Sequence, residues 1–247
     1  MKIIYTALIL LSMVFFSSAA AMAEEVAEEK KDKTFSASVE LGVFSSYINE
    51  NTGEYTNGLM TTAGFLLTHN PSGLYFVALS YISEKGFDEV DVYFGESFKL
   101  KGITFDLGVV YYNVDTLSNM EGDSVGAYAG ARFQEVCGFV PFAYLEKMLS
   151  LHEEFIGSGG FVWKIGAEKE DFLKIGEWLI ALKLEAGGNS GIYDTDPMFV
   201  SFARCTISTP IKIYGLEVSP LITFQQDFGG IAETGLRVIG GINLAVW

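Results

Sequence analysis

The stretch from Glu89 to Asn113 alternates between apolar and polar side chains in two runs that meet at Lys101-Gly102. The apolar set is Val90, Val92, Phe94, Phe98, Leu100, Ile103, Phe105, Leu107, Val109 and Tyr111. A period of two over about ten residues predicts a β-strand, and two such runs around a tight turn predict a hairpin. One face of this hairpin is apolar and the other is polar. It therefore either covers the core of a soluble protein or belongs to a membrane barrel whose apolar face meets lipid.

The N-terminus has the three parts of a secretory signal peptide. Met1 to Ala23 contains one basic residue, Lys2, an apolar run from Ile3 to Phe16, and small residues ending in Ala21-Met22-Ala23. This pattern predicts export and cleavage after Ala23. The expected order is a signal peptide over residues 1–23, a flexible charged periplasmic leader over 24–33, and one barrel domain over 34–247.

Composition favours the membrane barrel over the soluble sheet. Hydrophobic residues make up 49% of the chain, but after the N-terminal segment no apolar run approaches the ~20 residues of a spanning helix. A transmembrane barrel needs an apolar exterior, so it carries more apolar residues than a soluble sheet does. We therefore expect an all-β protein, a closed antiparallel up-and-down β-barrel in the Gram-negative outer membrane. A soluble exported sheet protein is the alternative fold.

The alternating runs predict about twelve strands, with ten as the alternative, since bacterial barrels have even numbers. Short connections near His69, Lys101, Gly138 and Thr209 alternate with longer polar ones. That order is typical of barrels with short periplasmic turns and longer outer loops. One of the last strands is expected at about Lys212 to Gln225.

Three features fit the barrel pattern less well. Ala167 to Glu177 predicts a helical turn or a plug-like excursion, and the sequence alone does not decide between these and a long connection. Glu96 falls among the lipid-facing residues near the middle of its strand, where a charge is unfavourable. The last strand ends at Trp247, an aromatic residue of the kind the barrel-insertion machinery reads, but Trp247 is out of phase with the apolar set before it.

Between Ser38 and Asp115, aromatic, glycine and acidic positions follow in a distinctive order. They are Ser46-Tyr47, Gly58, Glu89, Asp91, Tyr93, Gly95, Asp106, Gly108 and Tyr111-Tyr112. This order resembles the TorF-type putative porins, a family of small proteobacterial outer-membrane barrels. The resemblance covers about a third of the chain and implies a porin-like role without a known substrate.

Charged side chains at the alternate strand positions opposite the apolar set are expected to line the lumen. These candidates are Glu40, Asp91, Asp106, Arg132, Lys183, Glu185, Glu217 and Arg237. Opposite charges inside a narrow barrel either cross-link it shut or build a transverse field across a pore. Acidic residues assigned to the outer loops, Asp123 and Asp227 among them, predict a negative mouth that favours cations or neutral solutes.

Residues suited to catalysis or metal binding are few. The only histidines, His69 and His152, are expected in connections at opposite ends of the barrel, too far apart to share a metal ion. A lipid hydrolase would need His152 beside a serine such as Ser150. Cys137 and Cys205 would reach an oxidising compartment, where a disulfide is permitted, but isolated thiols fit equally well. We expect no enzyme activity, no cofactor and no metal site.

The sequence thus predicts a porin-like outer-membrane channel for passive diffusion of small hydrophilic solutes, weakly cation-preferring. Its expected partners are outer-membrane lipid, lipopolysaccharide, the insertion machinery and the solutes themselves, with no nucleic acid. The main alternative is a non-conducting structural or surface-interaction barrel whose lumen is filled by its own tyrosines and ion pairs. An outer-membrane lipid hydrolase is a further alternative.

Overall fold

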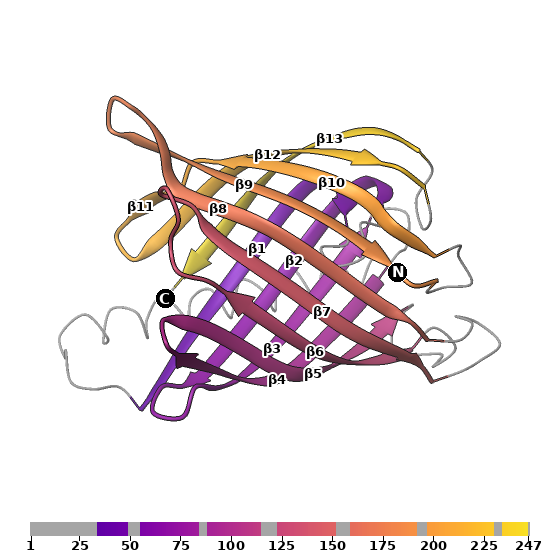
Figure 1. The fold of residues 1–247 in the computed structure, drawn as a ribbon. Coiled ribbons are helices and arrows are strands. Elements are labelled where there is room, and N and C mark those ends of the chain that lie inside the picture. Colours follow the sequence, from indigo (N-terminus) through magenta and orange to yellow (C-terminus); the bar gives the residue numbers. More distant parts are fainter. Residues whose placement is uncertain are drawn as a thin grey trace, which may run out of the picture.

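The chain forms a closed antiparallel barrel (Figure 1), seen in a computed structural model that describes residues 34–48, 55–83, 88–114, 123–151, 159–191, 197–229 and 234–246. The strands are β1 (Phe35–Ile48), β2 (Tyr55–His69), β3 (Leu74–Ser83), β4 (Asp88–Leu100), β5 (Ile103–Val114), β6 (Ser124–Arg132), β7 (Val140–Ser150), β8 (Phe161–Ile175), β9 (Trp178–Asn189), β10 (Met198–Ser208), β11 (Ile211–Ile213), β12 (Leu216–Asp227) and β13 (Gly235–Val246). The predicted signal peptide and leader, and Trp247, lie outside the described residues.

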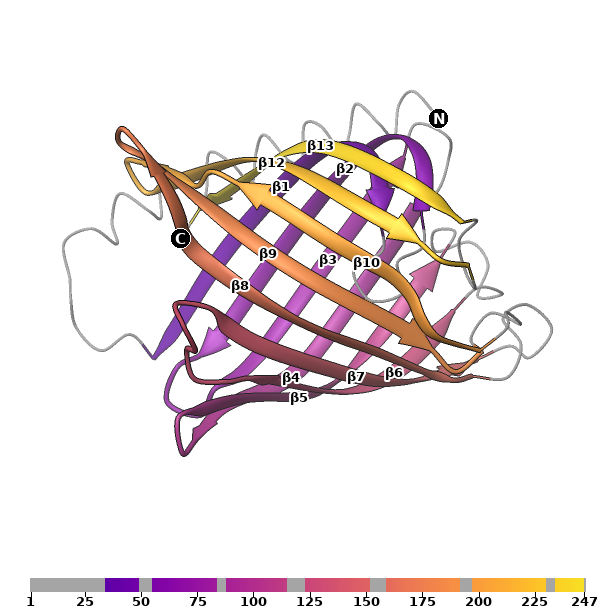
Figure 2. The same ribbon diagram turned by 45° about the horizontal axis from the view of Figure 1, so that its top comes forward.

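Twelve strands make up the ring, although thirteen segments are distinguished. β10 and β11 are separated only by Thr209 and Pro210, and both pair with β12, β10 through Ser208↔Leu221 and β11 through Ile211↔Val218. They are therefore one strand interrupted at a proline, which cannot donate a backbone hydrogen bond. β1 pairs with β13 and closes the ring, so the prediction of twelve antiparallel strands is confirmed. Figure 2 shows the tilted strands crossing on the two walls.

The short connections gather at one end of the barrel, here called the short-turn end. The turns Lys101-Gly102, Cys137-Gly138 and Tyr214-Gly215 all have positive φ at both residues, the backbone of a two-residue hairpin turn that suits the twist of the flanking strands. The turn at Tyr214-Gly215 corrects the expected strand at Lys212 to Gln225. The chain reverses within that segment, and β12 begins at Leu216.

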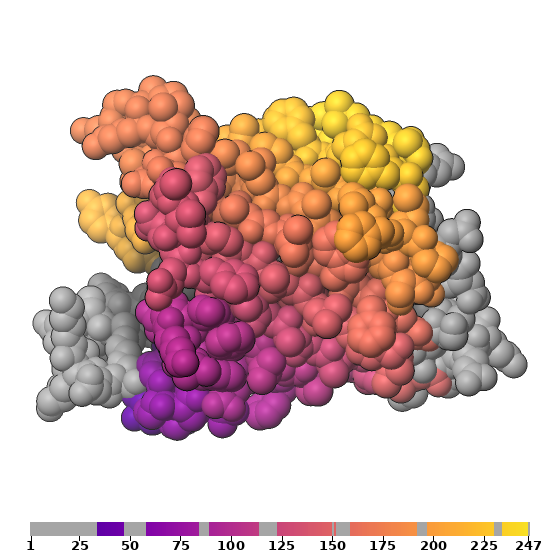
Figure 3. Space-filling view, viewed as in Figure 1, coloured from indigo at the N-terminus to yellow at the C-terminus, as the bar shows by residue number. Residues whose placement is uncertain are grey.

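The segment Ala167 to Glu177 is a strand extension, so the expected helical turn or plug is wrong. β8 continues to Ile175, turns at Gly176-Glu177 and returns as β9. The pairing of β7 with β8 stops at Val140↔Glu168, and that of β9 with β10 stops at Ala181↔Ser208. Residues 169–180, here called the overhang, consequently project beyond the wall as a two-stranded ribbon, visible at the upper left of Figures 1 and 3.

The two faces of the wall differ as the alternation predicts. On β4 and β5 the apolar side chains of Phe94, Leu107 and Val109 are 55%, 44% and 55% exposed on the exterior. Their neighbours Asp91 and Tyr112 are buried inside, with 2% and 5% exposed. An apolar exterior around a polar interior is the arrangement that a bilayer requires of a barrel. Within the described residues, no helix is long and apolar enough to cross a membrane.

Glu96 is exposed on the exterior, as its parity predicts. Its partner on β3 is Leu74, the first residue of that strand, and its partner on β5 is Leu107. Glu96 is therefore level with the short turn between β2 and β3 and not near the middle of the wall, where a charge is most costly.

Candidate functional site

The barrel encloses a cavity of about 630 Å³. All twelve strands of the ring contribute lining residues, so the cavity lies in the lumen and is not a cleft in one wall. Two groups of side chains dominate it. The first is a network of charged groups on β9, β10 and β12, and the second is a set of tyrosines on β3 to β7.

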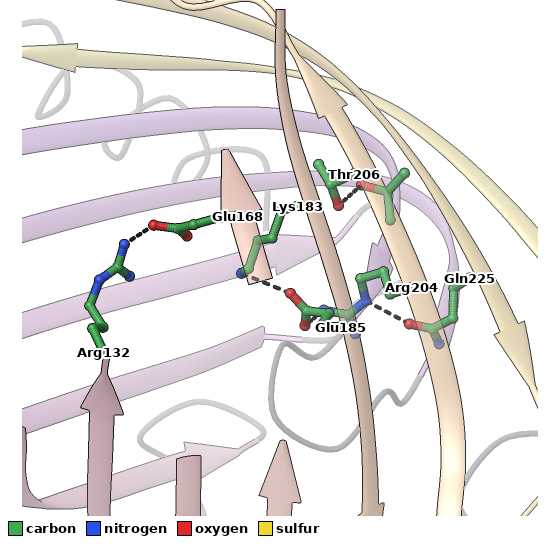
Figure 4. A network of polar contacts seen from close by, with 8 residues as sticks. Arg132, Glu168, Lys183, Glu185, Arg204, Thr206 and Gln225 are labelled. Atoms are coloured by element: carbon green, nitrogen blue, oxygen red, sulfur yellow. Dashed lines mark hydrogen bonds and ion pairs between the residues drawn. The ribbon is translucent and has the colours of Figure 1, made fainter. Parts of the chain in front are cut away.

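The charged network centres on Glu185 of β9 (Figure 4). Its Oε2 lies 2.8 Å from Nζ of Lys183, and its Oε1 lies 3.1 Å from Nη1 of Arg204 on β10. Nε of Arg204 donates to Oε1 of Gln225 on β12 at 2.8 Å. Cross-strand pairing of Glu185 with Arg204, and of Arg204 with Gln225, aligns the three polar groups. One carboxylate thus contacts two cations, and the network connects three strands.

The network continues toward the end of the barrel opposite the short-turn end. Nε2 of Gln225 donates to Oδ1 of Asp227 at 2.6 Å, and Arg237 of β13 lies 3.4 Å from the other oxygen of Asp227. Asp227 is buried, and so is Asp123, which accepts hydrogen bonds from Tyr111 and Asn113. Both acids, which were expected on outer loops, are therefore buried and hydrogen-bonded, and the predicted negative mouth stays a prediction.

Tyrosines cover the opposite part of the lumen. The hydroxyls of Tyr75 and Tyr128 are hydrogen-bonded at 2.6 Å, and the ring of Tyr128 stacks on that of Tyr144 with centroids 6.0 Å apart. A Cβ atom on Gly95 would lie 2.6 Å from the hydroxyl of Tyr128. Glycine at that position is what allows the rings to lie flat against the wall.

Two buried carboxylates lie among these tyrosines. Glu146 of β7 accepts hydrogen bonds from Tyr112 and Tyr144 at 3.0 and 2.6 Å. Asp91 of β4 lines the cavity opposite Tyr112 in the β4–β5 register. We call the inner face formed by these two acids with Tyr93, Tyr112, Tyr128 and Tyr144 the tyrosine wall.

The eight lumen candidates from the sequence fall into two groups. Five of them line the cavity: Glu40, Asp91, Asp106, Lys183 and Glu185. The other three form ion pairs away from its lining, Arg132 with Glu168, Glu217 with Lys212, and Arg237 with Asp227. Of the eight, Lys183 and Glu185 form an ion pair with each other.

Three central residues were missed at the sequence level: Glu146, Lys164 and Arg204. All three lie on the inward parity of their strands, so the alternation carried the signal. Glu146 lies within β7, which runs from Val140 to Ser150. Lys164 on β8 and Arg204 on β10 likewise alternate with neighbours that face outward.

The side chains suited to metal binding lie apart in the described part of the chain. No three histidine, cysteine, aspartate or glutamate side chains there could hold a metal ion. His69 is a turn residue whose Nδ1 is 2.7 Å from the hydroxyl of Ser72. Cys137 is exposed in a short turn and Cys205 is on β10, and both are free thiols. His152 lies outside the described residues.

The fold is similar to that of small outer-membrane porins. The KdgM porin aligns with a TM-score of 0.56 at 6% identity, covering 85% of this chain and 98% of the porin. The NanC porin aligns with a TM-score of 0.57 at 8% identity, covering 86% and 100%. At such low identity the likeness establishes the fold alone, that of an outer-membrane β-barrel.

Sequence comparison adds no family. No family model matches the chain, and no curated protein matches it by sequence. The resemblance to TorF-type putative porins therefore stays a prediction, whereas its coarser content, a small porin-like barrel, agrees with the structural similarity.

Proposed function

We propose that this protein is an outer-membrane channel for passive diffusion of small hydrophilic solutes, with a weak preference for cations. The exported chain would insert through its C-terminal strand, with lipid and lipopolysaccharide around the apolar exterior. The observation that carries the proposal is the lumen cavity of about 630 Å³, lined by polar and charged groups from every strand of a closed ring. Barrels of eight strands fill their interior with side chains and those of sixteen leave a channel, so twelve strands leave room for a narrow one.

The cation preference is supported by the charges that line the cavity. Among the described lining residues there are four carboxylates, Glu40, Asp91, Asp106 and Glu185, and three cationic groups, Lys164, Lys183 and Arg204. The whole chain carries a formal net charge of -15. A slight excess of negative charge in a narrow, low-dielectric passage raises the local concentration of cations.

A planar bilayer experiment tests this function. Purified protein should give discrete current steps, and in a potassium chloride gradient the reversal potential should indicate preference for potassium. The variant Glu40→Gln should reduce that preference, while Glu96→Gln, the same change on the exterior, should leave it unaltered. Anion preference in the unmodified protein would overturn the selectivity proposed, and absence of steps at every voltage would overturn the channel.

One observation favours the alternative of a non-conducting structural barrel. Val110, Tyr112, Tyr128, Met148 and Val162 form a buried cluster inside the ring, so side chains fill part of the lumen. If this filling extended across the barrel, the protein would span the membrane without conducting. The hydrolase alternative depends on His152 and Ser150, whose side chains lie outside the described part of the structure.

A further inference from the structure

The tyrosine wall already shows how it can hold an ammonium group. Nζ of Lys164, on β8, lies 5.5 Å from the ring centroid of Tyr144. The hydroxyl of Tyr144 donates to Glu146, whose carboxylate also attracts the Lys164 charge. An ammonium is thus placed between an aromatic face and a carboxylate, the combination that recognises such cations in proteins.

Asp91 also lies among tyrosines on this wall, but it forms no ion pair with a lysine in the described residues. It lies on the cavity lining, 2% exposed, and its Oδ1 has no hydrogen-bond partner in the described part of the chain. Its carboxyl group is hydrogen-bonded to Glu89 and to the hydroxyl of Tyr93, and its other charged neighbour, Glu146, is also acidic. Asp91 forms none of the ion pairs found among the described residues. A buried carboxylate in this situation requires a compensating cation or proton.

Aromatic rings flank Asp91 on two sides. Tyr93 is two residues further along β4 on the same face, and Tyr112 is the direct cross-strand partner of Asp91 on β5. Their ring centroids are 6.2 Å apart at an interplanar angle of 84°, so the two faces point in different directions. The two rings meet edge to face on the same inner face of the wall as Asp91, so aromatic surface borders the carboxylate.

The chemistry of the site distinguishes an organic cation from a metal ion. Metal ions such as Ca²⁺ and Mg²⁺ require several oxygen ligands around one point, and the described residues bring no three suitable side chains together in that way. An alkylammonium group needs fewer charged ligands and gains from aromatic surfaces. The tyrosine wall provides one carboxylate oxygen and two rings at this position.

We propose that Asp91, Tyr93 and Tyr112 form a binding site for the ammonium group of a small organic solute passing through the lumen. The inference rests on the proposed channel function, because the solute reaches Asp91 from the cavity. It narrows the proposed cation preference to organic amines, held at one place on the wall.

The test measures block of potassium current by butylammonium in planar bilayers, with butyrate as the oppositely charged control. Butylammonium should reduce the current of the unmodified protein and butyrate should not. Asp91→Asn should raise the half-blocking concentration by about tenfold or more, as expected for losing a buried charge pair. Asp171→Asn, the same change on the exposed overhang, should leave the half-blocking concentration as it was.

The ring contribution is tested at Tyr93. Tyr93→Phe keeps the aromatic ring and removes only the hydroxyl that is hydrogen-bonded to Asp91, so its half-blocking concentration should stay closer to that of the unmodified protein than that of Tyr93→Leu does. Tyr93→Leu should raise the half-blocking concentration by about threefold to tenfold. These two variants also test the proposed site if Asp91→Asn does not fold. Equal block in Tyr93→Phe and Tyr93→Leu would then overturn the site.

Calorimetric titration in detergent separates this proposal from the channel function. If no variant conducts, the channel is overturned, and butylammonium binding to the unmodified protein still tests the site. Binding that is lost in Asp91→Asn supports the site. Absence of binding, or equal binding by the unmodified protein and Asp91→Asn, overturns the site. Conduction that butylammonium does not block would also overturn it, and is the outcome expected if Glu89 and Asp91 are neutralised by a shared proton.

Discussion

At the scale of single residues, the lumen is stabilised unevenly. The Glu185 side chain is 1% exposed and compensates Arg204, which is 6% exposed, together with Lys183. The Glu217 side chain pairs at 3.7 Å with Lys212, which is 81% exposed. Buried charges lose their hydration and depend on each other, whereas water solvates an exposed partner whether or not the pair forms.

The same substitution, glutamate to glutamine, should therefore change the free energy of unfolding by different amounts at the two positions. Glu185→Gln removes the charge that compensates buried Arg204 and should lower the free energy of unfolding by about 3 kcal/mol. Glu217→Gln should lower it by no more than about 0.5 kcal/mol. Urea unfolding in lipid vesicles, followed by tryptophan fluorescence, measures both. Similar losses in the two variants would contradict the central place given to Glu185.

The sequence predicts whether a side chain points to the lumen or to the lipid, but it does not predict which inward side chains contact one another. A period of two assigns Glu185 to the lumen because only the parity of its own strand matters. Its ion pair with Arg204 depends on the register between β9 and β10 and on which rotamers meet across it. The burial of Asp227 likewise depends on Gln225 and Arg237, which alternation places inside without specifying their partners.

At the scale of strands and hairpins, the overhang shows where pattern reading failed. Charged residues interrupt the alternation in β8, and its register with β9 shifts by two residues between the pairs Lys169↔Leu182 and Leu173↔Ile180. The two extra residues of β8 leave Leu173 on the same face as Lys169, but they interrupt the regular pairing over residues 170–172. The turn at Tyr214-Gly215 was missed for a different reason, since a Tyr-Gly pair within an apolar run lacks the polar residues typical of turns.

The overhang should be the least protected part of the barrel wall. Its strands pair only with each other, whereas residues 161–167 have paired neighbours on both sides, β7 and β9. Hydrogen exchange measured by mass spectrometry on the protein in vesicles should show faster exchange over residues 170–179 than over 161–167, because a two-stranded ribbon opens locally at lower free energy. Equal protection of the two segments would mean that the ribbon has a partner in the membrane.

At the scale of the whole molecule, closure and orientation follow from elementary requirements. A membrane offers no hydrogen bonds to a strand edge, so β1 must pair with β13. The even strand number places the start of β1 and the end of β13 at the same end, next to the short turns. By the usual arrangement of such barrels, this end faces the periplasm.

The two native cysteines can test that orientation. Cys137 is exposed in the short turn between β6 and β7, whereas Cys205 lies between two lumen-lining residues, Arg204 and Thr206, and so points to the lipid. A bulky, charged maleimide should leave intact cells unlabelled, label Cys137 once the outer membrane is permeabilised, and reach Cys205 only after unfolding. The variants Cys137→Ser and Cys205→Ser assign each signal. Labelling of Cys137 in intact cells would place the short turns outside, and labelling of Cys205 in the folded protein would show that this part of the exterior is not covered by lipid.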